Sequence, residues 1–221
     1  MEARSFRLRT PWIFTLGAGV YEAITGQERW RADCRAMAAR VPGPRVLDLG
    51  IGPGVSGIEM VRAAPATKLV GVDASPQMIA RARRHAAAAG VRLPLVRGDV
   101  ARLPFATAAY DGATGHSLLY LLPDGDGALR EVHRVVRPGG GVAFLEPAAV
   151  AGRRRWAAVR HAFADGVRFG ISMLLWSVFS RLHGRYTAER LAAQLVRCGF
   201  REPNVSPAFD GLGLLAIARR P

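Results

Sequence analysis

Apolar residues follow two different spacings along this chain between residues 45 and 147. Short runs rich in Val, Leu and Ala alternate with longer segments in which apolar residues recur every three or four positions, as on one face of an α-helix. The short runs predict β-strands at 45–50, 68–73, 93–98, 110–116 and 141–146. The longer segments predict helices near 54–64, 76–89 and 125–136. Such alternation is typical of an α/β fold with a mostly parallel sheet and helices on both faces.

Local chemistry marks the start of two helices and one turn. Ser75 precedes Pro76, which is typical of a helix start because a hydroxyl caps the first amides and proline suits the first turn. Thr187 opens another helical segment, with Arg190 three residues later and therefore without the acidic half of a capping box. Outside the alternating core, the pattern predicts helices within 11–40 and at 187–198, and closing strands at 203–209 and 212–219. Asp210-Gly211 lies between these two strands and favours a hairpin turn.

Residues 150–186 form a long insertion after the fifth predicted strand. Six of its apolar residues recur at the spacing of one helix face: Ile171, Leu174, Leu175, Val178, Phe179 and Leu182. This spacing predicts an amphipathic helix. A charge-free run such as 169–180 is shorter than the roughly 20 residues that a membrane-spanning helix requires.

The formal net charge is +14, from 31 basic and 17 acidic side chains. Thirty of the basic residues are arginine, which together with many alanines indicates a compositional bias rather than selection for nucleic acid. Segment 151–185 carries seven arginines and one acidic residue, and the first 45 residues carry eight basic and four acidic ones. These segments could face anionic lipid, an anionic substrate or nucleic acid, or form an ordinary solvated surface.

The turn after the first strand contains GPGVSG at 52–57, a G-x-G-x-x-G motif that occurs with several adenosine-bearing cofactors. Asp73 ends the second strand about 20 residues on, where a ribose-binding acid is expected for a dinucleotide as well. The position of Asp48 distinguishes a dinucleotide from S-adenosylmethionine as the expected cofactor. If the turn begins at Gly50, Asp48 lies at the carboxyl end of its strand, facing the crevice in which such sheets bind ligands. A carboxylate there would repel a pyrophosphate but attract the amino group and sulfonium of S-adenosylmethionine.

Five segments in order resemble the motifs of class I S-adenosylmethionine-dependent methyltransferases. They are VLDLGIGPG (46–54), LVGVDAS (69–75), VRGDVARLPF (96–105), AYDGATGHSLLYLL (109–122) and EVHRVVRPGGGVAFLEP (131–147). The last is similar to the subgroup that acts in ubiquinone and menaquinone biosynthesis. The resemblance implies a Rossmann-like sheet of seven strands in the order 3-2-1-4-5-7-6, with the seventh strand antiparallel, and S-adenosylmethionine as cofactor.

The resemblance also implies a cofactor site at the carboxyl edge of the sheet. The residues expected to hold the cofactor are Asp48, Gly50, Gly52, Gly54, Asp73, Ala74, Met78, Asp99, Val100, His116 and Ser117. In the family, the acid ending the second strand holds the ribose hydroxyls, and the third motif borders the adenine. Here these roles would fall to Asp73 and to Asp99 with the backbone of Val100.

Methyl transfer is an in-line displacement, so the protein must mainly align the acceptor and exclude water. A general base is needed only where the acceptor carries a proton. His116, just past the fourth strand, is the candidate base, and contact with the cofactor is its alternative role. Tyr120 and Glu146 could orient an acceptor hydroxyl, although core packing or helix capping would explain them equally well.

We expect a single methyltransferase domain composed of a helical cap (1–44), a cofactor-binding core (45–149), a lid (150–186) and closing elements (187–221). In this architecture the lid commonly roofs the substrate cavity. The large apolar residues of the expected roof are Trp156, Phe163, Phe169, Met173, Leu174, Trp176 and Phe179. Such a roof suits a hydrophobic small molecule, either aromatic, quinone-like or lipid-like. The same residues could instead pack the lid onto the domain or onto a twin subunit in a homodimer, and segment 151–185 could lie on an anionic membrane.

Other functions stay open. The chain could bind the cofactor as a regulatory or membrane-docking protein without turnover. A nucleic-acid methyltransferase ranks lower, because Gly115-His116-Ser117-Leu118 stands where enzymes acting on base nitrogens resemble one another in an Asn/Asp-Pro-Pro-aromatic run. Two cysteines form no disulfide framework, no spacing predicts a metal site, and a cytoplasmic location, peripheral to the membrane at most, is expected.

Overall fold

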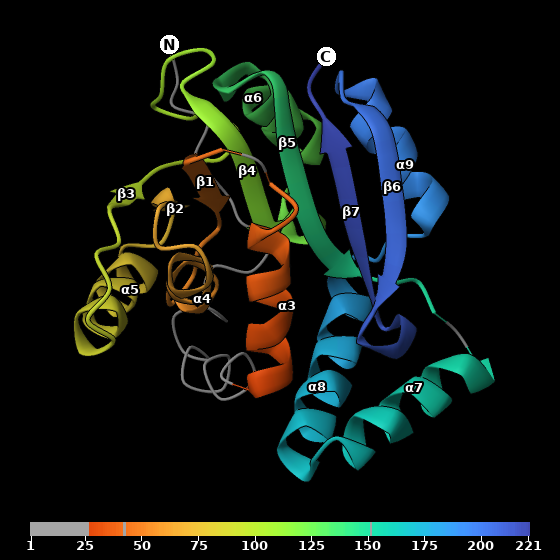
Figure 1. Ribbon diagram of the computed structural model, residues 1–221. Helices are drawn as coiled ribbons and strands as arrows, with labels where there is room; N and C mark the ends of the chain where they lie inside the picture. The colour runs from red at the N-terminus through yellow and green to blue at the C-terminus, as the bar shows by residue number, and fades with distance from the viewer. Residues whose placement is uncertain (1–26, 42, 151) are drawn as a thin grey trace.

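The computed structural model describes residues 27–41, 43–150 and 152–221, so most of the helical region predicted within 11–40 lies outside the described residues (Figure 1). Its strands form one sheet in the order β3-β2-β1-β4-β5-β7-β6, which confirms the predicted topology. The strands are β1 (Arg45–Leu49), β2 (Lys68–Asp73), β3 (Leu95–Arg97), β4 (Tyr110–His116), β5 (Val136–Pro147), β6 (Arg201–Ala208) and β7 (Gly213–Arg219). As predicted, β7 is antiparallel to its neighbours β5 and β6, while the remaining pairs are parallel.

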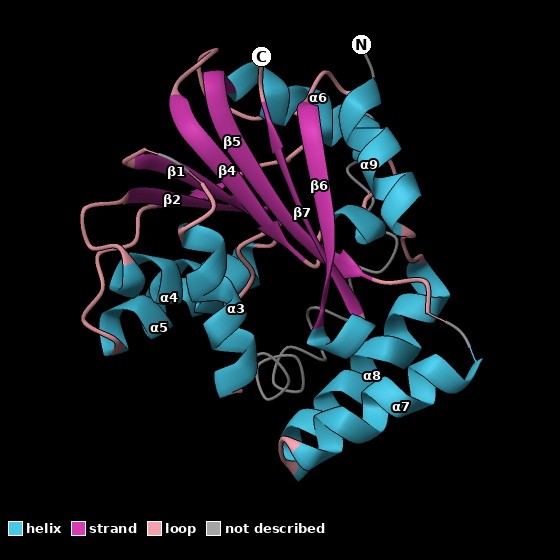
Figure 2. Cartoon of the chain, turned by 45° about the vertical axis from the view of Figure 1, so that its right-hand side comes forward, coloured by secondary structure: helices cyan, strands magenta, loops and turns pink. Residues whose placement is uncertain are grey.

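Helices cover both faces of the sheet, as the alternation predicted. They are α3 (Glu28–Ala38), α4 (Val55–Ala63), α5 (Pro76–Ala88), α6 (Gly125–Val135), α7 (Gly152–Ala164), α8 (Val167–His183) and α9 (Ala188–Arg197). Figure 2 shows α3, α4 and α5 on one side of the sheet and α6 and α9 on the other. Both predicted caps are confirmed, since the Ser75 hydroxyl accepts a hydrogen bond from the amide of Met78 and the Thr187 hydroxyl accepts one from Arg190.

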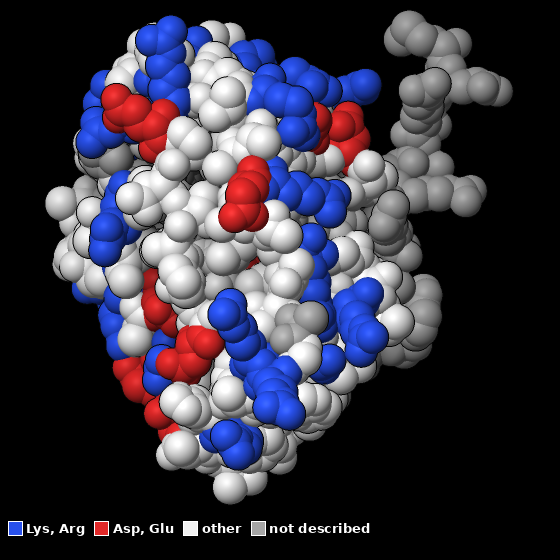
Figure 3. Space-filling model, turned by 90° about the vertical axis from the view of Figure 1, so that its right-hand side faces the viewer, with Lys and Arg blue, Asp and Glu red and all other residues white. Residues whose placement is uncertain are grey.

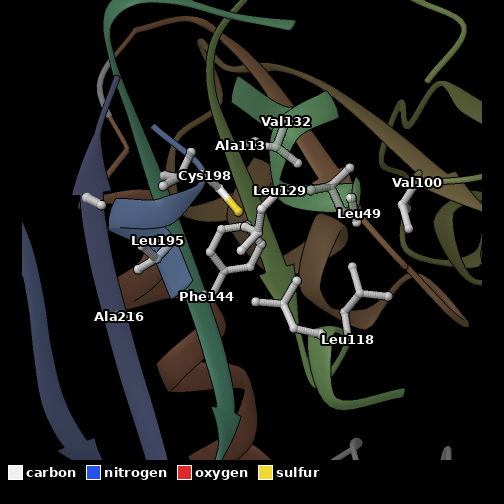
Figure 4. Packing of buried hydrophobic residues seen from close by; sticks show 14 of the residues in the cluster. Leu49, Val100, Ala113, Leu118, Leu129, Val132, Phe144, Leu195, Cys198 and Ala216 are labelled. Atoms are coloured by element: carbon white, nitrogen blue, oxygen red, sulfur yellow. The ribbon is translucent and has the colours of Figure 1, made fainter. Parts of the chain in front are cut away.

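The larger hydrophobic core lies between the sheet and helices α6 and α9. Leu129 and Val132 of α6, Phe144 of β5 and Leu195 of α9 meet there (Figure 4). Leu129, Phe144 and Leu195 are fully buried. This core holds the carboxyl ends of β1 and β4 in register, and the candidate site begins at those ends.

Helix α3 is fixed over the carboxyl edge of the sheet by a buried carboxylate. Glu59 of α4 forms ion pairs with Arg31 and Arg35 of α3, at 3.2 and 2.6 Å, and Arg62 approaches it at 3.7 Å. Removing one partner of such a buried group is costly, because the remaining charge is left without compensation. The attachment keeps Trp30 of α3 in the core.

The lid contains the helix that the sequence predicted, and the structure adds which of its sides is buried. It consists of two helices, α7 and α8, and the predicted apolar stripe of α8 faces outward: Ile171, Leu175, Val178 and Leu182 are exposed. The buried side of α8 instead carries small residues among larger ones, including Gly170, Ser172, Ser177 and Ser180. These small residues allow close approach, as at Gly170, where an added Cβ would lie 2.3 Å from the ring of Phe163 in α7.

Candidate active site

A pocket opens where β1, β2 and β4 end. Its lining residues come from the turns that follow these strands and from the segment after β3: Gly50, Gly52, Asp73, Ala74, Ser75, Met78, Gly98, Val100, His116, Ser117, Leu118, Leu121 and Leu122. Eight of them were predicted to hold the cofactor: Gly50, Gly52, Asp73, Ala74, Met78, Val100, His116 and Ser117. The prediction missed Ser75 and Gly98, which flank predicted residues, and the three leucines after β4, which resemble ordinary core residues in the sequence.

The glycine turn after β1 brings backbone close to this pocket. Gly50 and Gly52 both have left-handed backbone, with φ of 61° and 54°, which favours glycine. A Cβ on Gly50 would lie 2.7 Å from Cδ1 of Leu118. The amide of Gly52 donates a hydrogen bond to Asp73 at 2.9 Å, and the amide of Ser75 donates to the same carboxylate at 2.8 Å. Asp73 therefore fixes two lining turns at once.

Asp48 lies near the carboxyl end of β1, with only Leu49 between it and the turn that begins at Gly50, as predicted. It is only 1% exposed and does not line the pocket. Its carboxylate accepts hydrogen bonds from the hydroxyls of Ser56, at 2.6 Å, and Thr114, at 2.9 Å. Burial raises the pKa of Asp48 to about 6, because the two hydroxyls only partly offset the lost hydration. Direct contact between Asp48 and a ligand's positive charge stays a prediction.

His116 ends β4 and lies deep in the site. Its ring centroid is 4.2 Å from that of Trp30. Burial without a charged partner lowers the pKa of His116 to about 3, so the imidazole is neutral near pH 7. Ser117 follows it with left-handed backbone, at φ 53°, a strained conformation for serine that often occurs at functional sites.

An aromatic cluster continues from His116 away from the glycine turn. Trp30 stacks on Phe209 with centroids 5.2 Å apart and planes at 12°, and it meets Trp176 edge-on at 5.7 Å. The three rings come from α3, from the 3₁₀ turn (Phe209–Gly211) between β6 and β7, and from α8. No spacing in the sequence indicates that these distant residues meet, and only Trp176 was predicted to lie near the substrate.

Comparison with known proteins agrees with this geometry. Residues 46–140 match the family described as Methyltransferase domain. A demethylmenaquinone methyltransferase of Thermus thermophilus is 36% identical over 118 residues, which are 53% of this chain and 54% of that protein. The core is a class I S-adenosylmethionine-dependent methyltransferase domain. The chain spans about half the length of the curated relatives it matches.

Two further similarities extend beyond the core of the methyltransferase domain. An arsenite methyltransferase of Halobacterium salinarum is 30% identical over 177 residues, which are 78% of this chain and 41% of that protein. A solved S-adenosylmethionine-dependent methyltransferase structure from Methanococcus maripaludis superposes with a TM-score of 0.72 at 18% identity, covering 100% of this chain and 97% of that one. The second similarity shows that the described residues outside 46–140 belong to the same fold as the matched core.

The residues of the methyltransferase domain fit S-adenosylmethionine better than a dinucleotide. The left-handed glycine turn offers close backbone approach, and Asp73 presents a carboxylate to the pocket, as ribose hydroxyls require. None of the described residues that line the pocket is Lys or Arg, which a pyrophosphate would favour. The buried Asp48 adds further negative charge behind the turn.

Two predicted catalytic residues of the methyltransferase domain lie outside the pocket lining. The carboxylate of Glu146 accepts hydrogen bonds from the amides of Leu118, Leu119 and Tyr120, at 3.0, 2.8 and 3.3 Å. Burial raises the pKa of Glu146 to about 7. Glu146 thus caps the turn that shapes the pocket wall, the alternative that the sequence left open. Tyr120 is buried and meets Phe179 edge-on. Catalytic roles for both stay predictions.

Two predicted cofactor residues also have structural roles beside the pocket. Asp99 accepts a hydrogen bond from the amide of Ala101 at 2.8 Å and lies between the lining residues Gly98 and Val100. Gly54 has left-handed backbone, with φ 92°, and is the N-cap of α4. Contact of Asp99 and Gly54 with a bound adenosine stays a prediction.

The expected apolar roof is only partly formed. Phe169, Met173 and Trp176 are buried around the aromatic cluster. Trp156 and Phe163 are 57% and 38% exposed, so the prediction is wrong for these two residues. The buried side of α7 carries Ala158, Val159 and Ala162, which leaves Trp156 outside, while the ring of Phe163 packs against Gly170 of α8 and stays partly exposed.

Proposed function

We propose that this chain transfers the methyl group of S-adenosylmethionine to a hydrophobic acceptor, either aromatic, quinone-like or lipid-like, held between the glycine turn and the aromatic cluster. One observation carries this proposal. Four buried polar atoms have no hydrogen-bond partner among the described residues. One is Nε2 of His133 on α6, and the other three lie at the pocket or the aromatic cluster: Nε2 of His116, Oγ of Ser117 and Nε1 of Trp176. Buried polar atoms are rarely left unpaired, so this group supports a ligand that brings its own polar atoms to an apolar site.

Different residues around the site would bind the cofactor and position the acceptor. When bound, S-adenosylmethionine supplies a methyl group on a positively charged sulfur, which becomes a neutral thioether as the acceptor attacks. The turn at Gly50 and Gly52, together with Asp73, would hold the adenosine and keep it in one orientation. Trp30 and Trp176 would bound the acceptor ring and exclude water. Such alignment alone supplies roughly 7–11 kcal/mol of a barrier.

His116 would orient the acceptor rather than act as a strong base. With a pKa of about 3 it is neutral near pH 7 and can accept a hydrogen bond, but it holds a transferred proton weakly. An acceptor with an already acidic hydroxyl, such as a phenol or a quinol, suits this chemistry better than an alcohol. The name of the Thermus thermophilus relative supports a quinone-like acceptor in particular.

Turnover with a panel of phenols, catechols and quinols tests this proposal. The full chain is incubated with S-adenosylmethionine carrying a labelled methyl group, and label in the extracted acceptor is counted. His116→Gln should lower kcat with little change in cofactor affinity. His161→Gln is the matched control, because His161 lies exposed on α7 and does not line the pocket.

Two results would overturn the proposed acceptor. Cofactor binding by calorimetry without transfer to any member of the panel would favour the regulatory alternative. Label in DNA or RNA instead of the panel would favour a nucleic-acid methyltransferase. The predicted homodimer also stays a proposal, and gel filtration with light scattering of the same preparation measures it directly.

A further inference from the structure

The exposed apolar side chains of this protein are concentrated on the lid. Eight large apolar side chains are exposed among the described residues, and seven belong to α7 or α8: Trp156, Phe163, Val167, Ile171, Leu175, Val178 and Leu182. The eighth is Val196 on α9. Single exposed apolar residues are ordinary on a protein surface, but a concentration of this kind marks a binding surface. We call these seven residues the outer face.

The five α8 members of the outer face follow one side of that helix. They stand at i, i+4, i+8, i+11 and i+15 from Val167 to Leu182, and the last is 77% exposed. The opposite side of α8 buries Met173 and Trp176 in the core. Helix α7 lies alongside, joined by a 2.8 Å hydrogen bond from Arg155 to the Ser177 hydroxyl. Figures 1 and 2 show α7 and α8 side by side beyond one end of the sheet, and both helices carry members of the outer face.

The charged side chains of α7 and α8 are mainly basic. Exposed arginines on the two helices are Arg153, Arg154, Arg160, Arg168 and Arg181. Asp165 is the single acidic residue of 152–185, and it forms an ion pair with Arg29 of α3. Figure 3 shows basic side chains over the middle of the lower half of this view, where Figure 1 places α7, and acidic side chains along its left side. The long apolar stems of these arginines extend the apolar area, while their charged ends remain in water.

We propose that the outer face docks on an anionic lipid bilayer, with α7 and α8 lying in the plane of the interface. Apolar side chains on one face of a helix, flanked by arginine, suit the boundary between acyl chains and negative headgroups. A second copy of the chain suits this face less well, because it would bring two sets of arginines together. No described helix is both long and apolar enough to span a bilayer, so the contact would be at its surface.

Docking would bring the aromatic cluster close to lipid. Trp176 lies on the inner side of α8, and the outer face lies on the other side of the same helix. One helix would therefore separate the bilayer from the proposed acceptor site. This placement suits an acceptor that enters from the membrane, although the docking itself does not depend on the methyl-transfer proposal.

Co-sedimentation of the full chain with vesicles tests the docking. Binding is compared for vesicles of phosphatidylcholine alone and for vesicles containing phosphatidylglycerol, at about 0.02 M and about 0.5 M salt. Leu175→Gln/Leu182→Gln should weaken binding about tenfold or more. Val196→Gln is the matched control, since Val196 is 55% exposed on α9, and it should bind like the native chain. Arg153→Gln/Arg160→Gln should weaken binding to anionic vesicles about 30-fold, whereas Arg83→Gln/Arg84→Gln on α5 should change it little.

Specific results would overturn this proposal. Native protein that stays in the supernatant with anionic vesicles at low salt contradicts it. Equal losses in the α8 variant and in Val196→Gln would show that the outer face has no special role. A stable dimer in gel filtration that dissociates in Leu175→Gln/Leu182→Gln would assign the face to a second copy. Cofactor binding by calorimetry confirms that each variant is folded, and this control separates failure of docking from failure of the methyl-transfer proposal.

Discussion

Replacing Asp48 by asparagine removes a carboxylate that the fold buries behind the glycine turn. Burial raises its pKa from 3.8 to about 6. A raised pKa in the folded state means that the proton stabilises the fold, so this stabilisation is fully present below pH 3.8 and is lost as pH rises through about 6. At about 1.36 kcal/mol per pH unit, the loss is at most about 3 kcal/mol. The free energy of unfolding of Asp48→Asn should therefore fall less than that of the native chain between pH 4 and 7.

Cofactor binding should show the opposite dependence on pH. A positively charged ligand near Asp48 favours the ionised carboxylate, so binding would expel a proton wherever Asp48 is protonated in the free protein. With a pKa of about 6, about 0.9 proton should leave per cofactor at pH 5, about 0.5 at pH 6 and about 0.1 at pH 7. Affinity should weaken by up to about tenfold for each pH unit below 6.

Titration calorimetry in buffers of different ionisation enthalpy measures both quantities. Asp48→Asn should bind more weakly at pH 8 and should lose the proton release at pH 5. Asp111→Asn is the control, because Asp111 is a buried acid at the amino end of β4, and the side chains of Arg137 and Arg45 hold its pKa at about 2. The inference from Asp48 is refuted if the native chain releases no proton at pH 5, or if Asp48→Asn keeps native affinity across the range.

Three further predictions concern the walls of the site. Gly50→Ala should abolish cofactor binding and cost more stability than the about 1–2 kcal/mol of a left-handed alanine, because its Cβ would also clash with Leu118. Gly90→Ala, also left-handed but with open space around it, should cost only about 1–2 kcal/mol and leave binding intact; calorimetry and urea unfolding compare them. Trp30→Ala should cost about 3–5 kcal/mol by urea unfolding and raise the pKa of His116 in an NMR titration, because water reaches the imidazole. Glu146→Gln should flatten the fall in stability between about pH 4.5 and 7, since the raised pKa of Glu146 makes its protonated form the stabilising one; an unchanged slope in thermal unfolding would contradict this.

The sheet could be predicted from sequence because its central strands are nearly continuous apolar runs with turn residues between them. The apolar pattern does not predict the start of strand β5. This strand begins at Val136, five residues before the predicted start, since Arg137-Pro138-Gly139-Gly140 resembles a turn in sequence. In the structure Val136 pairs with Tyr110 before a register shift, and this pairing depends on a neighbouring strand that local sequence does not reveal.

The lid shows that hydrophobic spacing predicts a helix without telling which of its sides is buried. Both sides of α8 carry apolar residues, and the spacing identified only the stripe from Ile171 to Leu182. The structure buries the other side, where Gly170 lets Phe163 of α7 approach closely. Which side of α8 is buried therefore depends on the surface that the helix packs against. Local sequence likewise does not reveal the contact between the rings of Trp30 and His116, because these residues are 86 positions apart.

Sequence similarity to known proteins covers only part of the site. The matched domain, residues 46–140, contains the glycine turn, Asp73 and His116. Trp30, Trp176 and Phe209 all lie outside it, in segments that close over the same edge of the sheet. The match therefore constrains the cofactor side of the site far more than the acceptor side. Substrate choice in this chain should follow the cap and lid helices, so exchanging the cluster residues should change the preferred acceptor while leaving cofactor affinity within a few-fold of native.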